Sequence, residues 1–409
     1  MSVDAPLLEI AARYCAEGSA LGIMVSGGGD SMALLDLLHR AAVGQRLEVL
    51  TIDHGLRAAA RAEAEMVAAY CGARGIAHQI SRWTRGEAAG NLMDAARQAR
   101  YLIAADWAQA RGLSRVAVGH TADDQAETFL IGLARQAGID GLSGMRRHWM
   151  QGGVRFDRPL LGVTRADLRS YLRRNGVVWA DDPTNDDTHY TRVKARKALA
   201  QLGSLGITAQ GLAAVSDHLE TARQALLGQL GTAVQSVTET AAGSLMIPRA
   251  GFEVLPAEIK RRLLIAALRW ISGANYPPRE AALANLMQVM GRGGDTTLGG
   301  VRFRSTASTI TVQREARAQR GQICATYQTW DGRWQLSGPH APDLTIRALG
   351  ADGLRQIKDW RDTGLPREAL LVTPAIWQGQ TLIAAPCAGF SNGWCANCSA
   401  SFASFVLSH

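Results

Sequence analysis

Residues 21–43 read LGIMVSGGGDSMALLDLLHRAAV, and this stretch decides the fold. LGIMVS (21–26) is an apolar run with the length of a buried strand. SMALLDLLHRAAV (31–43) has apolar residues at the spacing of an amphipathic helix. Three glycines and an aspartate join the two. A strand, a glycine-rich turn and a helix in this order predict the first unit of an α/β fold.

Three more pairs of a strand and a helix follow in the first half of the chain. The predicted strands are EVLTID (48–53), IAHQIS (76–81) and SRVAVGH (114–120). The predicted helices occupy residues 58–74, 91–112 and 121–138. This alternation predicts a parallel twisted sheet with helices on both faces. Ligands of such sheets bind beyond the carboxyl ends of the strands, so the site is expected at residues 26–31, 53–57 and 119–127.

The second half of the chain has a different pattern, which predicts further domains. RPLLGVTRADLRSYLRRNG (158–176) contains a helix capped by Thr164. Helical periodicity continues from about residue 207, and residues 291–315 alternate as a β-hairpin does. Short strands then mix with many glycines and prolines. We therefore expect a catalytic domain, a mainly helical domain and a small α+β C-terminal domain, at residues 1–202, 203–320 and 321–409.

Composition limits the class of protein. The chain has 409 residues, of which 47% are hydrophobic, and a formal net charge of +8 at pH 7. A basic globular chain of this kind is suited to an anionic partner. The sequence has neither a signal peptide nor an apolar stretch that could span a bilayer, so a cytoplasmic protein without a membrane is expected. Six cysteines are too few for a disulfide scaffold, and the single Cys395-x-x-Cys398 favours a chance or surface pair over zinc.

A candidate phosphate loop consists of Ser26, Gly27, Gly28, Gly29, Asp30 and Ser31. Its glycines let backbone N–H groups approach an anion, and the helix N-terminus adds a positive dipole. The loop matches neither the Walker A motif nor the dinucleotide fingerprint. A carboxylate repels a polyphosphate unless a divalent cation lies between them, so Asp30 predicts Mg²⁺. The alternative is a tight turn in which Asp30 or Ser31 only caps the helix, and phosphate binding is favoured over it.

The stretch GHTADDQAE (119–127) follows the fourth strand and carries four ionisable side chains, those of His120, Asp123, Asp124 and Glu127. Thr121 and Asp124 fit an N-cap pairing, which accounts for Asp124 without any function. Asp123 and Glu127 are four residues apart, so they share a helix face that could hold Mg²⁺ or an ammonium group. His120 could donate to a phosphate oxygen. The cluster as a whole predicts a second part of the same site.

These motifs resemble those of a known superfamily. SGGGDS resembles the SGGxDS signature of the PP-loop ATP pyrophosphatases, which cleave ATP between its α and β phosphates. IDHGLR (52–57) and GHTADDQAET (119–128) resemble blocks of one of its families, the tRNA(Ile)-lysidine synthases. So does an element made of Asn91, Ala96, Arg97, Arg100 and Tyr101. The resemblance implies a Rossmann-like PP-loop ATPase fold. It also implies that Asp53 and His54, which on their own indicate ordinary turn chemistry, line the adenosine pocket.

A basic segment after the sheet carries the resemblance further. RPLL (158–161) and DPTNDD (182–187), followed by two arginines, resemble a stretch that closes over substrate in that family. Its cations are Arg192, Lys194, Arg196 and Lys197. RNA or phosphate contact is favoured for them over a solvated helix face. The chain departs from the family pattern here, because Val193 replaces the usual Asn and the continuation resembling His-x-Leu-Leu-Pro is missing.

The resemblance implies a reaction. ATP with Mg²⁺ would adenylate the C2 carbonyl oxygen of the wobble cytidine in a tRNA(Ile) with a CAU anticodon, and free L-lysine would then displace AMP. Asp123 is the expected lysine base, with Glu127 in reserve, because the lysine amine must lose a proton before it attacks. Asp30 and Asp123 would hold the metal. The expected catalytic residues are Asp30, His120, Asp123, Asp124 and Arg192.

Other functions remain open on the sequence. A PP-loop tRNA thiolase would need cysteines near the sheet, and an amide-forming synthetase for a small metabolite would not need the back half of the chain. A module that only senses a nucleotide or binds RNA is disfavoured by the intact acidic set. Base-stacking platforms in the back half could come from tryptophans that more often belong to a core, namely Trp330, Trp334, Trp360 and Trp377. The sequence also leaves a homodimer open.

Overall fold

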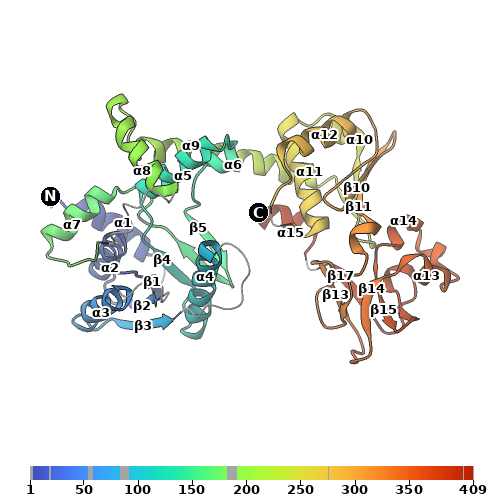
Figure 1. The fold of residues 1–409 in the computed structure, drawn as a ribbon, viewed down its shortest axis with the longest axis horizontal. Coiled ribbons are helices and arrows are strands. Elements are labelled where there is room, and N and C mark those ends of the chain that lie inside the picture. Colours follow the sequence, from blue (N-terminus) through green and yellow to red (C-terminus); the bar gives the residue numbers. More distant parts are fainter. Residues whose placement is uncertain are drawn as a thin grey trace. The chain divides into compact units, whose positions relative to one another are not determined.

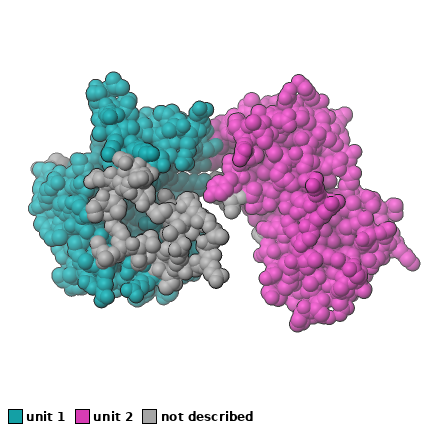
Figure 2. All heavy atoms as spheres, in the orientation of Figure 1, with its two compact units in different colours: residues 1–223 teal, residues 224–409 magenta. Residues whose placement is uncertain are grey.

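The computed structural model describes residues 3–17, 20–53, 59–82, 92–181, 191–274, 276–398 and 400–408. The chain forms two compact units, residues 1–223 and residues 224–409 (Figures 1 and 2). The first unit contains the predicted sheet. The second contains the later helices and several small sheets. No single helix among the described residues is long and apolar enough to cross a bilayer, although one bent pair of helical segments, Thr191–Leu205 and Ala209–Val234, passes by length and composition.

A six-stranded sheet forms the centre of the first unit, in the order β3-β2-β1-β4-β6-β5. Five strands are parallel and β5 is antiparallel to β6. The four predicted strands are confirmed, whereas β5 and β6 were not predicted. The strands are β1 Ala20–Met24, β2 Arg46–Asp53, β3 Ala77–Arg82, β4 Arg115–Val118, β5 His148–Gln151 and β6 Val154–Asp157.

Helices cover both faces of this sheet, because parallel strands with apolar side chains on both sides must be buried on both sides. Ile23 and Val49 point into the core formed with α1, α2, α3 and α7, whereas Met24 and Leu50 point into the core on the side of α4. The α/β prediction is therefore confirmed. The helices of the unit are α1 Ala5–Cys15, α2 Gly29–Ala41, α3 Ala59–Gly72, α4 Leu92–Ala110, α5 Ala122–Ala134, α6 Ile139–Leu142, α7 Arg165–Arg174 and α8 Thr191–Leu202.

The second unit begins within α9 (Ala209–Val234) and combines helices with an antiparallel sheet of order β7-β8-β11-β10-β9. The predicted hairpin is part of this sheet, so the region from residue 203 to 320 contains more strand than its helical pattern indicates. Its elements are β7 Thr238–Glu239, β8 Leu245–Pro248, α10 Arg249–Glu253, α11 Ala257–Ser272, α12 Glu280–Gly291, β9 Thr296–Leu298, β10 Val301–Ser305 and β11 Thr309–Arg314.

The tail of the chain is built from short elements. A four-stranded sheet has the order β12-β14-β15-β16, and β13 pairs with β17. Trp330, Trp334 and Trp377 are at most 3% exposed, so they belong to the core and offer no stacking surface. The main elements are β12 Cys324–Ala325, β13 Trp334–Ser337, β14 Thr345–Ala348, α13 Gly350–Arg355, α14 Arg367–Leu370, β15 Pro374–Gln378, β16 Thr381–Ala384, β17 Cys395–Cys398 and α15 Phe402–Ser408.

The last helix, α15, returns to the core of the middle region. Phe402 and Val406 are buried in the same cluster as Leu264 and Trp270 of α11. The rings of Phe402 and Trp270 meet edge to face with centroids 5.8 Å apart, and the Phe402 N–H donates to Glu239 (3.1 Å). Residues from the end of the chain thus complete a core that begins in α9.

Phe402→Ala is expected to destabilise the second unit by about 3–5 kcal/mol, because it removes a buried ring and leaves a cavity. Urea unfolding followed by tryptophan fluorescence measures this loss. Leu407→Ala, one turn along the same helix, is the matched control, since Leu407 is 77% exposed. The control should change stability by less than about 0.5 kcal/mol. Equal effects of the two substitutions would contradict the packing of α15.

Candidate functional site

The candidate phosphate loop connects β1 to α2. Gly27 has a φ of +88°, a conformation that favours glycine, and Gly28 is the N-cap of α2. Ser31 fixes the turn, because its Oγ donates to the Gly28 carbonyl (2.9 Å) and accepts from the Ser26 N–H (3.1 Å). The first N–H groups of a helix have no partner within that helix. The loop therefore presents backbone donors at the carboxyl edge of the sheet.

Gly119 brings the end of β4 against this loop. A Cβ atom at position 119 would lie 3.0 Å from Ser31 Cα and 3.1 Å from the Asp30 carbonyl oxygen. Both neighbours are backbone atoms, so they cannot turn aside as a flexible side chain would. Only a glycine lets the two strand ends approach this closely. The two motifs expected to form one site are thus adjacent in the structure.

The acids of α5 come directly after β4. Asp124 accepts hydrogen bonds from the Thr121 N–H (2.9 Å) and hydroxyl (3.1 Å), so the predicted N-cap pairing is confirmed. This explains one oxygen of Asp124. The other, Oδ1, faces Arg165 at 3.4 Å and Arg192 at 3.9 Å. Asp124 therefore has a structural role and also contributes charge to the site.

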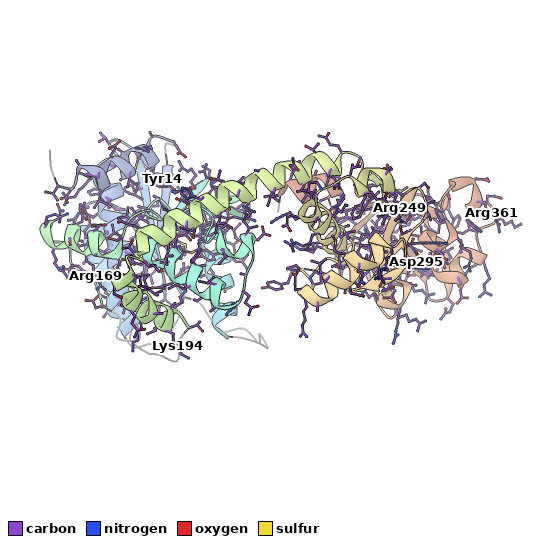
Figure 3. All side chains as sticks on the ribbon, turned by 90° about the horizontal axis from the view of Figure 1, so that it is seen from above. Tyr14, Arg169, Lys194, Arg249, Asp295 and Arg361 are labelled. Atoms are coloured by element: carbon purple, nitrogen blue, oxygen red, sulfur yellow. The ribbon has the colours of Figure 1, made fainter. Side chains whose placement is uncertain are left out.

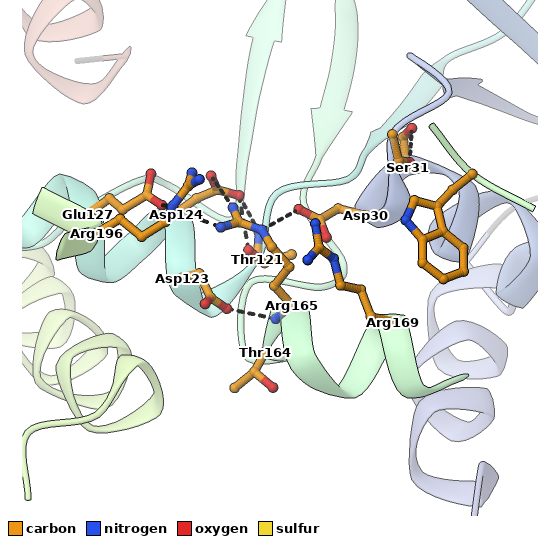
Figure 4. A network of polar contacts seen from close by, with 12 residues as sticks. Asp30, Ser31, Thr121, Asp123, Asp124, Glu127, Thr164, Arg165, Arg169 and Arg196 are labelled. Carbon is orange, nitrogen blue, oxygen red and sulfur yellow. Dashed lines mark hydrogen bonds and ion pairs between the residues drawn. The ribbon is translucent and has the colours of Figure 1, made fainter. Parts of the chain in front are cut away.

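Arg165, at the first position of α7, lies among these acids (Figure 4). Its Nε donates to Asp30 Oδ2 (3.1 Å), and its backbone N–H donates to Asp123 Oδ2 (2.7 Å). Its Nη1 lies 3.5 Å from Glu127 Oε1. Arg165 is not part of any motif predicted from the sequence. A signal was present, because a cation at a helix N-terminus opposes the helix dipole and needs a compensating partner.

The four cations of α8 divide into two pairs. Arg196 Nε donates to Glu127 Oε1 (2.9 Å), and Arg192 lies near Asp124 as given above, so both reach the acids. Lys194, which is labelled in Figure 3, and Lys197 are exposed to solvent. Val193, which departs from the family pattern, is 5% exposed, so an apolar side chain suits this position.

Glu127 is the most buried acid of the site, with a side chain 1% exposed. Its Oε1 is bound by the arginines described above. Its Oε2 is buried without a hydrogen-bond partner among the residues that the structure describes. A buried carboxylate oxygen in this state costs free energy until a donor reaches it. It is therefore a place where a cationic ligand group could bind.

The pKa values of two acids shift in opposite directions. Burial raises the pKa of Asp30, and the charge of Arg165 opposes this only in part. Burial alone would also raise the pKa of Asp124. There, however, His120, Arg165 and the hydrogen bond from Thr121 outweigh burial, and the pKa is lowered. Asp124 thus stays ionised more readily than Asp30 does.

His120 is oriented by Arg158, whose Nε donates to His120 Nδ1 (3.1 Å). Since a guanidinium can only donate, the proton of a neutral His120 must lie on Nε2. The guanidinium of Arg158 lies 4.0 Å from the centroid of the Trp149 ring, which holds it from β5. The N–H of a neutral imidazole thus lies on Nε2, and donation from His120 to a phosphate oxygen stays a prediction.

The remaining predicted positions concern the adenosine pocket, the family motifs and the metal. Asp53 ends β2, is 8% exposed and lies 3.7 Å from Arg82 Nε. His54, Asn91 and residues 182–187 lie outside the described residues, as do the side chains of Ala96 and Arg97. The described part of the chain contains no group of three or more His, Cys, Asp or Glu placed to hold a metal. Asp30 and Asp123 remain two separate candidates.

Comparison with known proteins adds to this geometry. A family model described as a PP-loop domain matches residues 3–202. A tRNA(Ile)-lysidine synthase of Ruegeria pomeroyi is 44% identical over 394 residues, which cover 95% of this chain and 94% of that protein. One of a Bradyrhizobium species is 36% identical and covers 73% and 86% of the two chains. One of Hyphomonas neptunium is 38% identical and covers 72% and 81%.

Proposed function

Because the chain belongs to the tRNA(Ile)-lysidine synthase family, a family of ATP-dependent ligases, we propose that it joins free L-lysine to C2 of the wobble cytidine in a tRNA(Ile) with a CAU anticodon. The observation that carries the proposal is the contact at Gly119, which joins the phosphate loop to the acids of α5. One motif is suited to a polyphosphate and the other to an ammonium group. A ligase that uses ATP and lysine needs both.

ATP would bind with its phosphates on residues 26–31 and its adenosine beside Asp53 and His54. The positive φ of Gly27 and the start of α2 fit this role, because they turn backbone donors towards an anion. Mg²⁺ is commonly held by one or two carboxylates together with substrate phosphates, so Asp30 alone can serve as the protein ligand, and Asp123 is the candidate for a second. When bound, the ion would neutralise phosphate charge beside these carboxylates.

The first step would be adenylation of the base. The C2 carbonyl oxygen of cytidine attacks the α phosphorus of ATP, the bond to the bridging oxygen breaks and pyrophosphate leaves. His120 Nε2 and the loop amides would donate to phosphate oxygens as charge develops on them. The Arg158 contact at Nδ1, which leaves the proton of a neutral imidazole on Nε2, supports this role. Adenylation converts the C2 oxygen into a good leaving group. The chain needs no covalent intermediate of its own.

The second step would be attack of the lysine ε-amine on C2, with departure of AMP. Free lysine is protonated near neutral pH, because its pKa is about 10.4. Oε2 of Glu127, which has no hydrogen-bond partner within the described part of the chain, is suited to receive the ammonium group. Asp123 is half-buried and therefore more accessible than Glu127, which favours Asp123 as the base that accepts the proton.

Asp123→Asn is expected to separate the two steps. Pyrophosphate release with tRNA should continue, while incorporation of labelled lysine should fall about 100-fold because the base is lost. Asp106→Asn, on the exposed face of α4, is the control and should change neither. Unchanged lysine incorporation would exclude Asp123 as the base. A matching loss of pyrophosphate release would instead assign this side chain to the metal.

The tRNA would contact the exposed cations Lys194 and Lys197 of α8. Arg192 and Arg196 point towards Asp124 and Glu127, so they would act on phosphate or substrate within the site. Contacts of exposed lysines with RNA phosphates should make affinity fall with salt. A tRNA substrate also implies that the protein acts in the cytoplasm.

The proposal is tested with purified protein, ATP and the CAU-anticodon tRNA(Ile), with and without free lysine. Pyrophosphate release should require the tRNA, and labelled lysine should appear in the tRNA. Failure of lysine to be incorporated would remove the assignment. A thiolase is disfavoured by the structure, because the two cysteines of the first unit, Cys15 and Cys71, are both buried in its core.

A further inference from the structure

We propose that Arg165 is a positioning residue for adenylation, which couples the phosphate loop to the acids of α5. This inference rests on the proposed function. Asp30 follows β1, whereas Asp123, Asp124 and Glu127 follow β4, so the four carboxylates come from two strand ends. Arg165 comes from neither of them. It enters from α7, a helix that lies outside both motifs.

The contacts of Arg165 use the whole guanidinium. Nε reaches Asp30 at 3.1 Å, Nη2 reaches Asp124 at 3.4 Å and Nη1 reaches Glu127 at 3.5 Å. The backbone N–H binds the remaining acid, Asp123, at 2.7 Å. One residue thus contacts all four carboxylates. Figure 4 shows the side chain between Asp30 and the acids of α5.

Burial strengthens the ion pairs of Arg165. The side chains of Arg165 and Asp30 are only 18% and 21% exposed, so water screens their attraction weakly. Arg192 lies near Asp124 and Arg196 binds Glu127, which are both acids of α5, whereas Arg165 reaches the acids of both strand ends. Without it, Asp30 and the α5 acids would repel one another and would also repel a polyphosphate.

Two effects of Arg165 can be separated by substitution. Arg165→Gln removes the positive charge, so the acids should repel ATP more strongly. Mg²⁺ can replace the missing charge, so this defect should shrink as Mg²⁺ is raised. Arg165→Lys keeps the charge but replaces the planar fork by one compact ammonium group, whose three donors do not match the positions of the three carboxylates. The Arg165→Lys variant should therefore bind ATP with nearly normal affinity but hold it in a geometry that is less favourable for adenylation.

The experiment measures binding of a fluorescent ATP analogue to the full chain at low and at saturating Mg²⁺, and pyrophosphate release with tRNA. Arg165→Gln should weaken binding about 10- to 100-fold at low Mg²⁺ and by less at saturating Mg²⁺. Arg165→Lys should bind the analogue within about threefold of the unchanged chain but release pyrophosphate about tenfold more slowly. A purely structural role would not produce this dependence on Mg²⁺.

Arg173→Gln, on the exposed face of the same helix, is the matched control. The proposal is overturned if Arg165→Gln binds the analogue as Arg173→Gln does, or if its defect is the same at both Mg²⁺ concentrations. An unchanged rate of pyrophosphate release in Arg165→Lys also overturns it, and this comparison stands even if Arg165→Gln fails to fold. If the unchanged chain releases no pyrophosphate with tRNA, the proposed function fails, whereas the binding comparison still decides the role of Arg165.

Discussion

Asp30→Ala is expected to slow pyrophosphate release by about 1000-fold, while affinity for tRNA stays close to that of the unchanged chain. The carboxylate is the acid of the phosphate loop and the proposed metal ligand, and it is also the partner of Arg165 Nε. Its removal leaves the phosphates without a bridging cation and removes the partner of Arg165 Nε, while the contacts of Arg165 with Asp124 and Glu127 remain. Initial rates with saturating tRNA and ATP measure the first effect, and filter binding of labelled tRNA measures the second.

Asp106→Ala provides the comparison, because it removes an exposed carboxylate from α4 of the same unit. Its rate should stay within about twofold of the unchanged chain, as exposed substitutions away from a site have small effects. A normal rate of pyrophosphate release in Asp30→Ala would refute the metal argument. A large loss of tRNA affinity would show that the substitution acts through folding.

Gly119→Val is expected to reduce adenylation about 100-fold. Its first side-chain carbon would already lie 3.0 Å from the backbone of Ser31, and the two further methyl groups need still more space. The phosphate loop must then move away from the end of β4, which misplaces backbone donors relative to His120. Binding of the fluorescent ATP analogue and pyrophosphate release should both fall.

Gly162→Val is the matched control for this substitution. A Cβ atom at position 162 would meet nothing within 4 Å, and its φ is not in the left-handed region. The same residue type is therefore introduced in the same unit without displacing the loop. If Gly119→Val and Gly162→Val had equal activity, the close approach of the two strand ends would not matter for function.

The sequence predicted the parts of the fold that follow from local patterns. The strands β1, β2 and β4 were identifiable because each contains an apolar run followed by a helical period, whereas β3 is largely polar and was identifiable from its place between two predicted helices. Strands β5 and β6 were not identifiable, since each has four residues and Gly152 and Gly153 separate them. The pairing of β6 with β4 is a tertiary event. In a segment of four residues, an alternation of polar and apolar side chains does not distinguish a strand from a loop.

The parts of the site that lie in local motifs were also predictable from the sequence, whereas Arg165 was not. Glycines and acids at strand ends are local signals, so the loop and the α5 cluster were found. The position of Arg165 depends on how α7 returns to the sheet, and α7 has three more arginines, Arg169, Arg173 and Arg174. Periodicity alone does not say which of them faces the acids. The unfavourable place of Arg165 in the helix dipole was the one local feature that distinguished it.

The return of α15 to the α11 core affects how the chain is made on the ribosome. The sheet of the first unit is complete once β6 has been synthesised, so this unit can fold while translation continues. The core around Trp270 must wait for Phe402 and Val406, which are added more than 130 residues later. A premature stop codon shortly before residue 402 would therefore release a chain whose first unit is folded and whose second unit is open to proteases.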